Sequence, residues 1–286
     1  MNEVVYKNFR RDEMEFQFQP RVAVPDYQRL SEERAKVSAA VRARLKSRLN
    51  IPYGKTPRQV VDIFPADKPN APVQVYIHGG YWRSGNKEDS HFLAETFVKA
   101  GVTVAFLEYD LCPDVTVTDI VRQARAGIAW IYRNIAKYGG DPSSFYIMGN
   151  SVGGQLVAMA LAHEWEKEGL PRDTIKGGAA ITGVYDLDPV FHVRVNEEIR
   201  LSQEIARENS PMLHPPLSHT PLIIAVGGNE PKGWKQMSFD FYTLCKSRGV
   251  DCQYLEIPGA HHYGMNALLG DPKSPLARAI FRQMGL

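Results

Sequence analysis

Short apolar segments alternate with helical segments along most of the chain. The apolar runs have the length and composition of buried strands, and they occupy residues 60–64, 73–77, 102–107, 144–148, 177–181, 221–226 and 252–257. The runs with helical spacing occupy residues 90–100, 117–136 and 155–163. Strands that alternate with helices in this way predict an α/β fold, with a mostly parallel sheet covered by helices on both faces.

Two segments do not follow this alternation. Residues 1–50 contain no strong strand, and a charged amphipathic helix is predicted over residues 26–49. We expect this N-terminal helical extension to pack on the rim of the sheet and wall a pocket; an oligomer contact is the alternative. A polar helical stretch near 193–209, within residues 186–212, is a candidate small cap. All of residues 1–286 are expected to form a single domain.

One serine lies between a predicted strand and a predicted helix. Residues 149–153 read G-N-S-V-G, which fits the G-x-S-x-G turn that holds a serine hydroxyl out toward a substrate. Both flanks that this pattern requires are present. Ser151 is therefore the candidate nucleophile, and the amide of Val152 is a candidate donor to the oxyanion. The alternative is a glycine-rich turn with an incidental serine.

A second turn supplies the other half of an acyl-transfer site. Residues 78–82 read H-G-G-Y-W and come directly after a strand. In a turn of this kind, the amides of Gly79 and Gly80 can face the oxygen that gains charge when a serine attacks a carbonyl. We expect His78 to hold the loop by hydrogen bonds rather than to transfer protons.

The nucleophile needs a base, and the base needs a carboxylate to orient it. Glu230 lies in a loop at the end of the strand at 221–226, where the acid of such a site is expected; Asp186 and Asp240 are the alternatives. The last strand leads to His261 and His262, and one of them should be the base. The order serine, acid, histidine is the order of the α/β-hydrolase triad.

Composition narrows the classes of partner. The chain of 286 residues has a net charge of +2 with mixed signs, so no basic face for nucleic acid is expected. No apolar run could span a bilayer and no N-terminal apolar segment resembles a secretion signal, so a cytoplasmic protein without a membrane partner is expected. Scattered histidines predict no metal site, and no cofactor is expected. The three cysteines are expected to be small buried side chains, at Cys112, Cys245 and Cys252.

These motifs together resemble a known family over most of the chain. The sequence is similar to the family of α/β-hydrolases that contains arylformamidase (kynurenine formamidase). It is also similar to the wider group of HGG-type carboxylesterases. The matching segments are residues 51–54, 61–65, 78–82, 139–142 and 182–189. The resemblance implies the α/β-hydrolase fold with a small cap. It also favours His262 over His261, because residues 262–264 match the H-F-D-like segment of the family.

The same resemblance implies the activity. We expect a serine hydrolase that cleaves an aryl amide of the N-formylkynurenine type through an acyl-enzyme. The alternatives are a carboxylesterase or carbamate hydrolase on small aromatic substrates, and a ligand-binding homologue without catalysis. Tyr81, Trp82 and Tyr185 are candidate walls for an aromatic leaving group, with core packing an equal alternative for the last two. A homo-oligomer is left open.

The sequence departs from the family pattern beside the nucleophile and in the triad. Asn150 and Val152 replace the His and Ala of the family's G-H-S-A-G-G, Glu230 replaces an Asp, and Gly264 stands where an Asp is common. None of these changes removes a catalytic group. Because side chains beside the nucleophile shape the pocket, these departures weaken the inference that the family's substrate is also the substrate of this chain.

Overall fold

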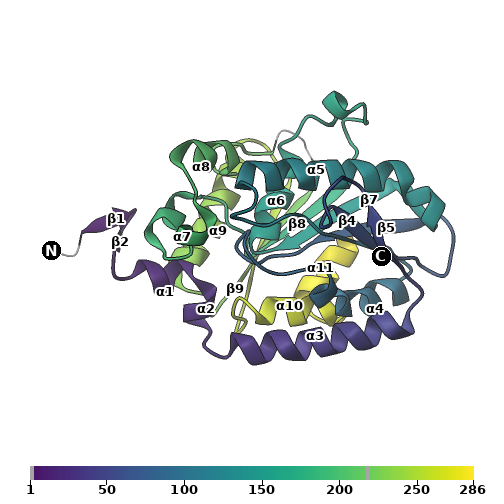
Figure 1. The fold of residues 1–286 in the computed structure, drawn as a ribbon, viewed down its shortest axis with the longest axis horizontal. Helices are drawn as coiled ribbons and strands as arrows, with labels where there is room; N and C mark the ends of the chain where they lie inside the picture. The colour runs from purple at the N-terminus through teal and green to yellow at the C-terminus, as the bar shows by residue number, and fades with distance from the viewer. Residues whose placement is uncertain (1–2, 217–219) are drawn as a thin grey trace.

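One eight-stranded sheet organises the molecule, which is described by a computed structural model over residues 3–216 and 220–286. The strand order is β10-β9-β8-β7-β5-β6-β4-β3 (Figure 1). Neighbours are parallel from β10 to β6, whereas β4 is antiparallel to β6 and β3 is antiparallel to β4. The bounds, in chain order, are β3 Arg48–Pro52, β4 Val60–Phe64, β5 Ala71–Ile77, β6 Thr103–Leu107, β7 Gly140–Asn150, β8 Gly177–Ile181, β9 Leu222–Gly227 and β10 Cys252–Ile257.

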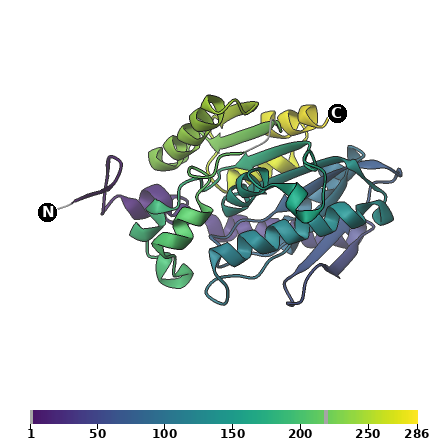
Figure 2. The ribbon, with the colours of Figure 1, turned by 90° about the horizontal axis from the view of Figure 1, so that it is seen from above.

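Helices cover both faces of this sheet, as the alternation predicts (Figures 1 and 2). One core cluster lies against α5 (Val117–Asn134), α6 (Val152–Leu161) and α9 (Lys232–Ser247). The other lies against α3 (Tyr27–Arg44), α4 (Phe92–Lys99), α10 (Gly264–Gly270) and α11 (Pro275–Gln283). Side chains alternate between the two faces along a strand. In β5, for example, Val75 belongs to the first cluster and Tyr76 to the second.

The N-terminal segment differs from its prediction at both ends. Strands β1 (Val4–Tyr6) and β2 (Phe9–Arg10) form a separate hairpin at the N-terminal tip (Figure 1). Short helices α1 (Met14–Phe18) and α2 (Pro20–Ala23) follow it. Helix α3 ends at Arg44, and β3 begins at Arg48, where a helix was predicted. Most residues of β3 are exposed, so this edge strand carries no apolar alternation that periodicity could detect.

The candidate cap forms three short helices. They are η4 (Asp188–His192), α7 (Asn196–Ile199) and α8 (Gln203–Asn209), and the chain turns between the last two at Arg200, where φ is +56°. Helix η4 contacts α1 and β1, and α8 contacts α5. The segment therefore packs against the N-terminal elements and one helix of the body.

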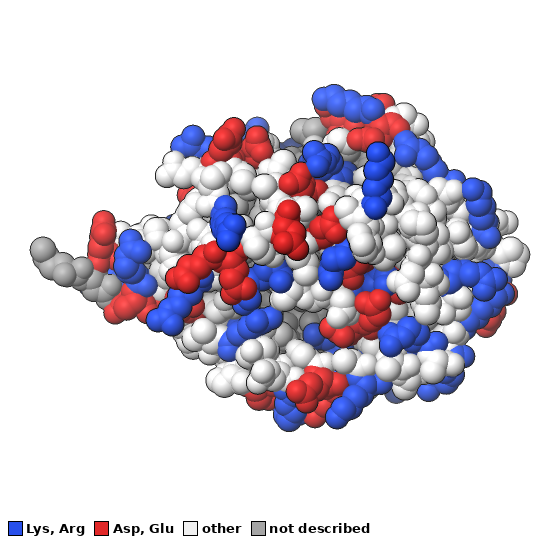
Figure 3. All heavy atoms as spheres, in the orientation of Figure 1, with Lys and Arg blue, Asp and Glu red and all other residues white. Residues whose placement is uncertain are grey.

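Charged side chains of both signs are mixed over the face shown in Figure 3. This distribution agrees with the net charge of +2. Within residues 3–216 and 220–286, no helix is both long and apolar enough to cross a membrane. The three cysteines are free and buried, as expected.

One buried hydroxyl joins α3 to the body of the protein. Ser38 is 1% exposed. Its Oγ donates to the carbonyl oxygen of Asp89 at 2.9 Å and accepts from the amide of Phe92 at 3.1 Å. The Ser38 hydroxyl thus satisfies two backbone groups at the start of α4 while holding the N-terminal extension against it.

Replacing this hydroxyl should weaken the attachment of α3. In Ser38→Ala the amide of Phe92 loses its buried partner, so we expect the free energy of unfolding to fall by about 1–3 kcal/mol. Urea denaturation measures the change. Thr243→Ala is the control, because the exposed Thr243 hydroxyl donates only within its own helix. Equal effects of the two substitutions would contradict this account of the contact.

Candidate active site

Four loops at one edge of the sheet carry the candidate catalytic groups. His78 follows β5, Ser151 follows β7, Glu230 follows β9 and His262 follows β10. Carboxyl ends of parallel strands meet at the same edge, where α/β folds bind their ligands. The strand order, with only β8 between β7 and β9, therefore gathers residues from distant parts of the sequence.

Ser151 occupies a strained turn between β7 and α6. Its backbone has φ of +58° and ψ of −122°, outside the regions that a residue with a side chain ordinarily adopts. The turn is tight, because a Cβ added at Gly149 would lie 2.3 Å from the carbonyl oxygen of Gly153. The Ser151 amide donates to the carbonyl oxygen of Ile181 at 2.8 Å, which ties the turn to β8. The geometry is that of a nucleophile elbow.

His262 and Glu230 are directly hydrogen bonded. The Nδ1 atom of His262 lies 2.7 Å from Oε2 of Glu230, and both residues are buried. The other carboxylate oxygen accepts from the amide of Gly227 at 2.9 Å, which fixes the orientation of Glu230. The ring of Trp234 packs edge-on against the His262 ring, with centroids 4.8 Å apart. An Nδ1–H donated to Glu230 leaves Nε2 of His262 available to accept a proton.

The alternative acids and the alternative base have other contacts. Asp186 accepts from the Tyr6 hydroxyl at 2.8 Å. Asp240 forms an ion pair with Lys7. His261 accepts from the amide of Gly264 at 3.2 Å. These contacts are structural, and none of them connects to the ring of His262.

The H-G-G turn lies against Ser151. A Cβ added at Gly79 would lie 3.0 Å from the Ser151 Cβ and 2.7 Å from the Asn150 carbonyl oxygen. Gly80 has φ of +130°, and a Cβ there would lie 1.8 Å from the Ser84 carbonyl oxygen. Gly79 is therefore required for the close approach of the two loops, and Gly80 for the tight turn within its own loop. Val152 begins α6, where backbone amides have no partner within the helix.

A buried polar network holds the H-G-G turn. His78 Nε2 lies 2.9 Å from Oε1 of Glu108, and Nδ1 lies 2.7 Å from the Gly79 carbonyl oxygen. The ring of Tyr109 stacks on that of His78, with centroids 4.3 Å apart, and the Tyr109 hydroxyl donates to the His78 carbonyl oxygen at 2.7 Å. His78 thus holds the loop, as the sequence predicts.

Glu108 is the centre of that network. It also accepts from Arg58 at 2.6 Å and from the amide of Lys87 at 2.9 Å. Burial alone would raise the pKa of Glu108, but the electrostatic attraction and hydrogen bonds of His78 and Arg58 outweigh it and lower the pKa to about 2. The carboxylate is therefore charged throughout the physiological range.

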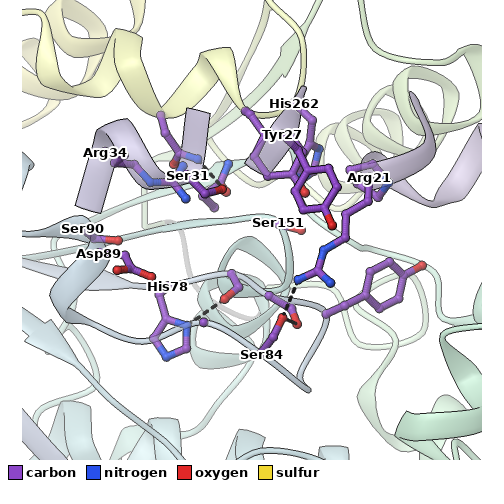
Figure 4. Close-up of a pocket in the computed structure, with 18 of the residues that line it drawn as sticks. Arg21, Tyr27, Ser31, Arg34, His78, Ser84, Asp89, Ser90, Ser151 and His262 are labelled. Atoms are coloured by element: carbon purple, nitrogen blue, oxygen red, sulfur yellow. Dashed lines mark hydrogen bonds between the residues drawn. The ribbon is translucent and has the colours of Figure 1, made fainter. Parts of the chain in front are cut away.

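A cavity of about 320 Å³ opens above Ser151 and His262 (Figure 4). Its floor is formed by the loops that follow β5, β7 and β10. Its opposite wall comes from α2, α3 and the residue before α2, with lining side chains Gln19, Pro20, Arg21, Tyr27, Gln28, Ser31, Glu32 and Arg34. The N-terminal extension thus walls the pocket, whereas residues 186–212 contribute none of its described lining.

The expected aromatic walls divide between the pocket and the core. Tyr81 lines the cavity, and its hydroxyl donates to the Phe18 carbonyl oxygen at 2.9 Å. Trp82 is fully buried, with its indole nitrogen 3.3 Å from Oε1 of Gln155. Tyr185 is fully buried and stacks on Phe241 at 4.3 Å. The assignment of Trp82 and Tyr185 to substrate contact is therefore corrected to core packing. Tyr27 and Tyr263 supply pocket rings that were not foreseen.

Asn150, the residue before the nucleophile, joins three loops. Its Nδ2 donates to Oγ1 of Thr182 at 2.9 Å, and its Oδ1 accepts from Nδ2 of Asn266 at 3.4 Å. Asn150 and Asn266 both line the cavity. An amide at this position can both donate and accept, so it links β8 and α10 to the elbow. No cluster of three metal-ligating side chains occurs in the part of the chain that the structure describes.

The sheet and the elbow define an α/β-hydrolase, and comparison with known proteins agrees. The family model BD-FAE matches residues 61–174. The kynurenine formamidase of Salmo salar is 30% identical, with 98% of each chain covered, and that of Danio rerio is 26% identical over the same shares. An esterase structure from Pyrobaculum calidifontis superposes with a TM-score of 0.71 at 20% identity, covering 96% of this chain and 97% of that one.

The full-length similarity is decisive for the family. This chain belongs to the α/β-hydrolase family that includes the kynurenine formamidases. It is a hydrolase acting on amide or ester bonds. The fold and the family predicted from the sequence motifs are confirmed.

The Glu108 network generates a test of loop stability. The pKa of Glu108 is lower in the folded protein than its ordinary value of 4.5, so its contribution is present above about pH 4.5 and is lost as the pH falls toward 2. Glu108→Gln should therefore lower the free energy of unfolding at pH 7 on the order of 3 kcal/mol. The difference from the unaltered protein should shrink between pH 4.5 and 3.

Denaturant titration at several pH values measures this change. Glu204→Gln on the exposed surface of α8 removes the same charge without a buried partner, and it should change stability little at any pH. A Glu108→Gln effect that stays constant from pH 7 to pH 3 would show that its cause is packing rather than charge.

Proposed function

We propose that the chain hydrolyses an aryl formamide of the N-formylkynurenine type, through a triad of Ser151, His262 and Glu230. The observation that supports the triad best is the 2.7 Å hydrogen bond between His262 Nδ1 and Glu230 Oε2, because His262 lines the same cavity as Ser151. Full-length similarity to kynurenine formamidases supports the substrate class.

The first half of the reaction acylates the serine. Ser151 Oγ attacks the formyl carbonyl carbon while Nε2 of His262 takes the hydroxyl proton. Glu230 keeps the imidazole in the required tautomer and stabilises its charged form. Because Gly227 holds the second carboxylate oxygen, Glu230 needs no reorganisation during this step.

The developing oxyanion is stabilised by backbone amides. Gly79 lies against the nucleophile, Gly80 follows it in a backbone that only glycine readily adopts, and Val152 begins the helix after Ser151. We assign the amides of these three residues to the oxyanion hole. Loss of one such donor typically raises the barrier by about 3 kcal/mol. The Glu108 network keeps this loop in place through His78.

The second half of the reaction frees the enzyme. The imidazolium of His262 donates its proton to the leaving amine, which departs as the C–N bond breaks. Water then attacks the formyl-serine while His262 accepts one of its protons, and formate leaves as Ser151 recovers its hydrogen. The same groups would cleave an ester with an easier leaving group, so carboxylesterase activity is the second candidate, favoured by the esterase relatives.

An aromatic leaving group has ring surfaces to contact. Tyr27 and Tyr263 line the cavity and stack on each other, with centroids 5.8 Å apart and planes 29° apart. Tyr81 lines the same cavity. Stacking against rings of this kind stabilises a flat substrate beyond the area buried. These residues replace Trp82 and Tyr185 as the aromatic contacts we propose.

Steady-state hydrolysis of N-formylkynurenine beside phenyl acetate tests the proposed function. The unaltered protein should cleave the formamide efficiently, and Ser151→Ala should lose at least about a thousandfold in kcat, because only the oxyanion hole and binding remain. Thermal unfolding of the variant serves as the folding control.

Three results would change the assignment. Ester cleavage that depends on Ser151, without formamide cleavage, would keep the serine mechanism and move the substrate to an ester or carbamate. Formamide cleavage undiminished in Ser151→Ala would rule out the serine as nucleophile. A folded protein without turnover on either substrate would favour the non-catalytic binding homologue.

The acid is tested separately from the nucleophile. Glu230→Gln should lower kcat by about 10²- to 10⁴-fold with little change in KM, because the amide cannot stabilise the imidazolium. Asp186→Asn and Asp240→Asn are matched controls, and each should stay within about twofold of the unaltered rate, since their contacts are with Tyr6 and Lys7. A larger loss in either control than in Glu230→Gln would reassign the acid.

A further inference from the structure

The catalytic cavity carries guanidinium groups that no part of the triad mechanism uses. Arg21 at the N-terminal end of α2 and Arg34 in α3 both line it, and Figure 4 shows their side chains on either side of Ser151. Both arginines come from the N-terminal extension. They face the nucleophile from the wall opposite the catalytic loops.

Neither guanidinium has an acidic partner. Arg21 donates to Oγ of Ser84 at 3.0 Å and lies over the ring of Tyr27 at 5.2 Å, so both contacts are with neutral groups. The Nε of Arg34 is buried without a hydrogen-bond partner. Among the described residues, no carboxylate lies within ion-pair distance of either arginine. By contrast Arg83, which lines the same cavity, is paired with Glu198 at 2.6 Å.

Two carboxylates also line the cavity. Glu32 is exposed to solvent at its rim. Asp89 lies on the wall across from Arg34, where burial raises its pKa and the charge of Arg34 opposes that rise. Asp89 and Arg34 influence each other through space but form no ion pair among the described residues.

Unpaired arginines in a partly enclosed cavity are costly unless a ligand offsets their loss of hydration. The guanidinium fork matches a carboxylate in shape and charge, and hydrogen bonds between the two are stronger than those between neutral groups. We propose that Arg21 and Arg34 form an anion subsite, which binds a carboxylate carried by the substrate while its carbonyl lies at Ser151. The inference rests on the proposed function for the position of the reacting carbonyl.

Matched esters separate this subsite from the reaction itself. Phenyl acetate is compared with 3-carboxyphenyl acetate, which places a carboxylate on the leaving group, and phenyl butyrate is compared with monophenyl succinate, which places it on the acyl group. We expect kcat/KM to favour the charged member of one pair by at least about tenfold. The pair that shows the preference tells which part of the substrate reaches the arginines. Added salt should reduce the preference.

Substitutions then identify the residues. Arg21→Gln and Arg34→Gln should each reduce that preference by roughly tenfold, mainly through a higher KM, and leave the neutral esters within about twofold. Arg21→Lys should retain part of the preference, since a lysine keeps the charge but loses the fork. Arg29→Gln is the control, because Arg29 lies on α3 but pairs with Asp26 and Glu33 on the surface. Arg29→Gln should leave the preference for the charged ester unchanged.

The inference would be overturned if kcat/KM were equal for the charged and the neutral ester in both pairs. It would also be overturned if the preference for the charged ester remained in both Arg21→Gln and Arg34→Gln. Loss in only one variant assigns the carboxylate to that guanidinium. A separate binding experiment tests the subsite if the proposed function is wrong. If no ester or formamide is turned over, calorimetric binding of 3-hydroxybenzoate and of phenol decides: tighter binding of the benzoate that needs Arg21 or Arg34 supports the anion subsite, and equal binding refutes it.

Discussion

The left-handed backbone at Ser151 is the constraint on which the site depends. A side chain at φ of +58° is unfavourable in isolation, so the turn persists only because its surroundings hold it. Those surroundings are β7 on one side, α6 on the other, and the bond from the Ser151 amide to Ile181 in β8. A Cβ at Gly149 would meet the carbonyl oxygen of Gly153, and a Cβ at Gly153 would meet that of Ile77 at the end of β5. The packing of the central sheet is thereby coupled directly to the exposure of one hydroxyl.

Two buried carboxylates support this turn from different directions. Glu230 is hydrogen bonded to His262, and Glu108 holds His78 in the loop that lies against Ser151. Each carboxylate also accepts a backbone amide, from Gly227 and Lys87 respectively. A side chain that is tied to a backbone amide has few alternative rotamers, so both groups are held before any ligand arrives. The site therefore combines strain at one residue with rigid polar support around it.

The sequence predicts the loops of the candidate site because their signals are local. The elbow, the H-G-G turn and the loops after two strands each occupy a few consecutive residues, and parallel strand order brings them together. Periodicity could not separate Trp82 and Tyr185 from pocket residues, since an aromatic ring suits a core and a cavity equally. The pairing of β3 with β4, and the position of Arg21 and Arg34 over the cavity, depend on long-range packing that no short pattern records.

The stacking of Tyr263 on Tyr27 has a consequence for how the enzyme could change over time. Tyr263 is the chain neighbour of His262, and Tyr27 is the first residue of α3. The wall opposite Ser151 therefore rests on the residue next to His262. Arg21 in the preceding short helix lies over the same Tyr27 ring, 5.2 Å from its centroid. A substitution of Tyr27 would thus remove the surface on which both Arg21 and Tyr263 rest, so this wall cannot be reshaped independently of the loop that carries His262.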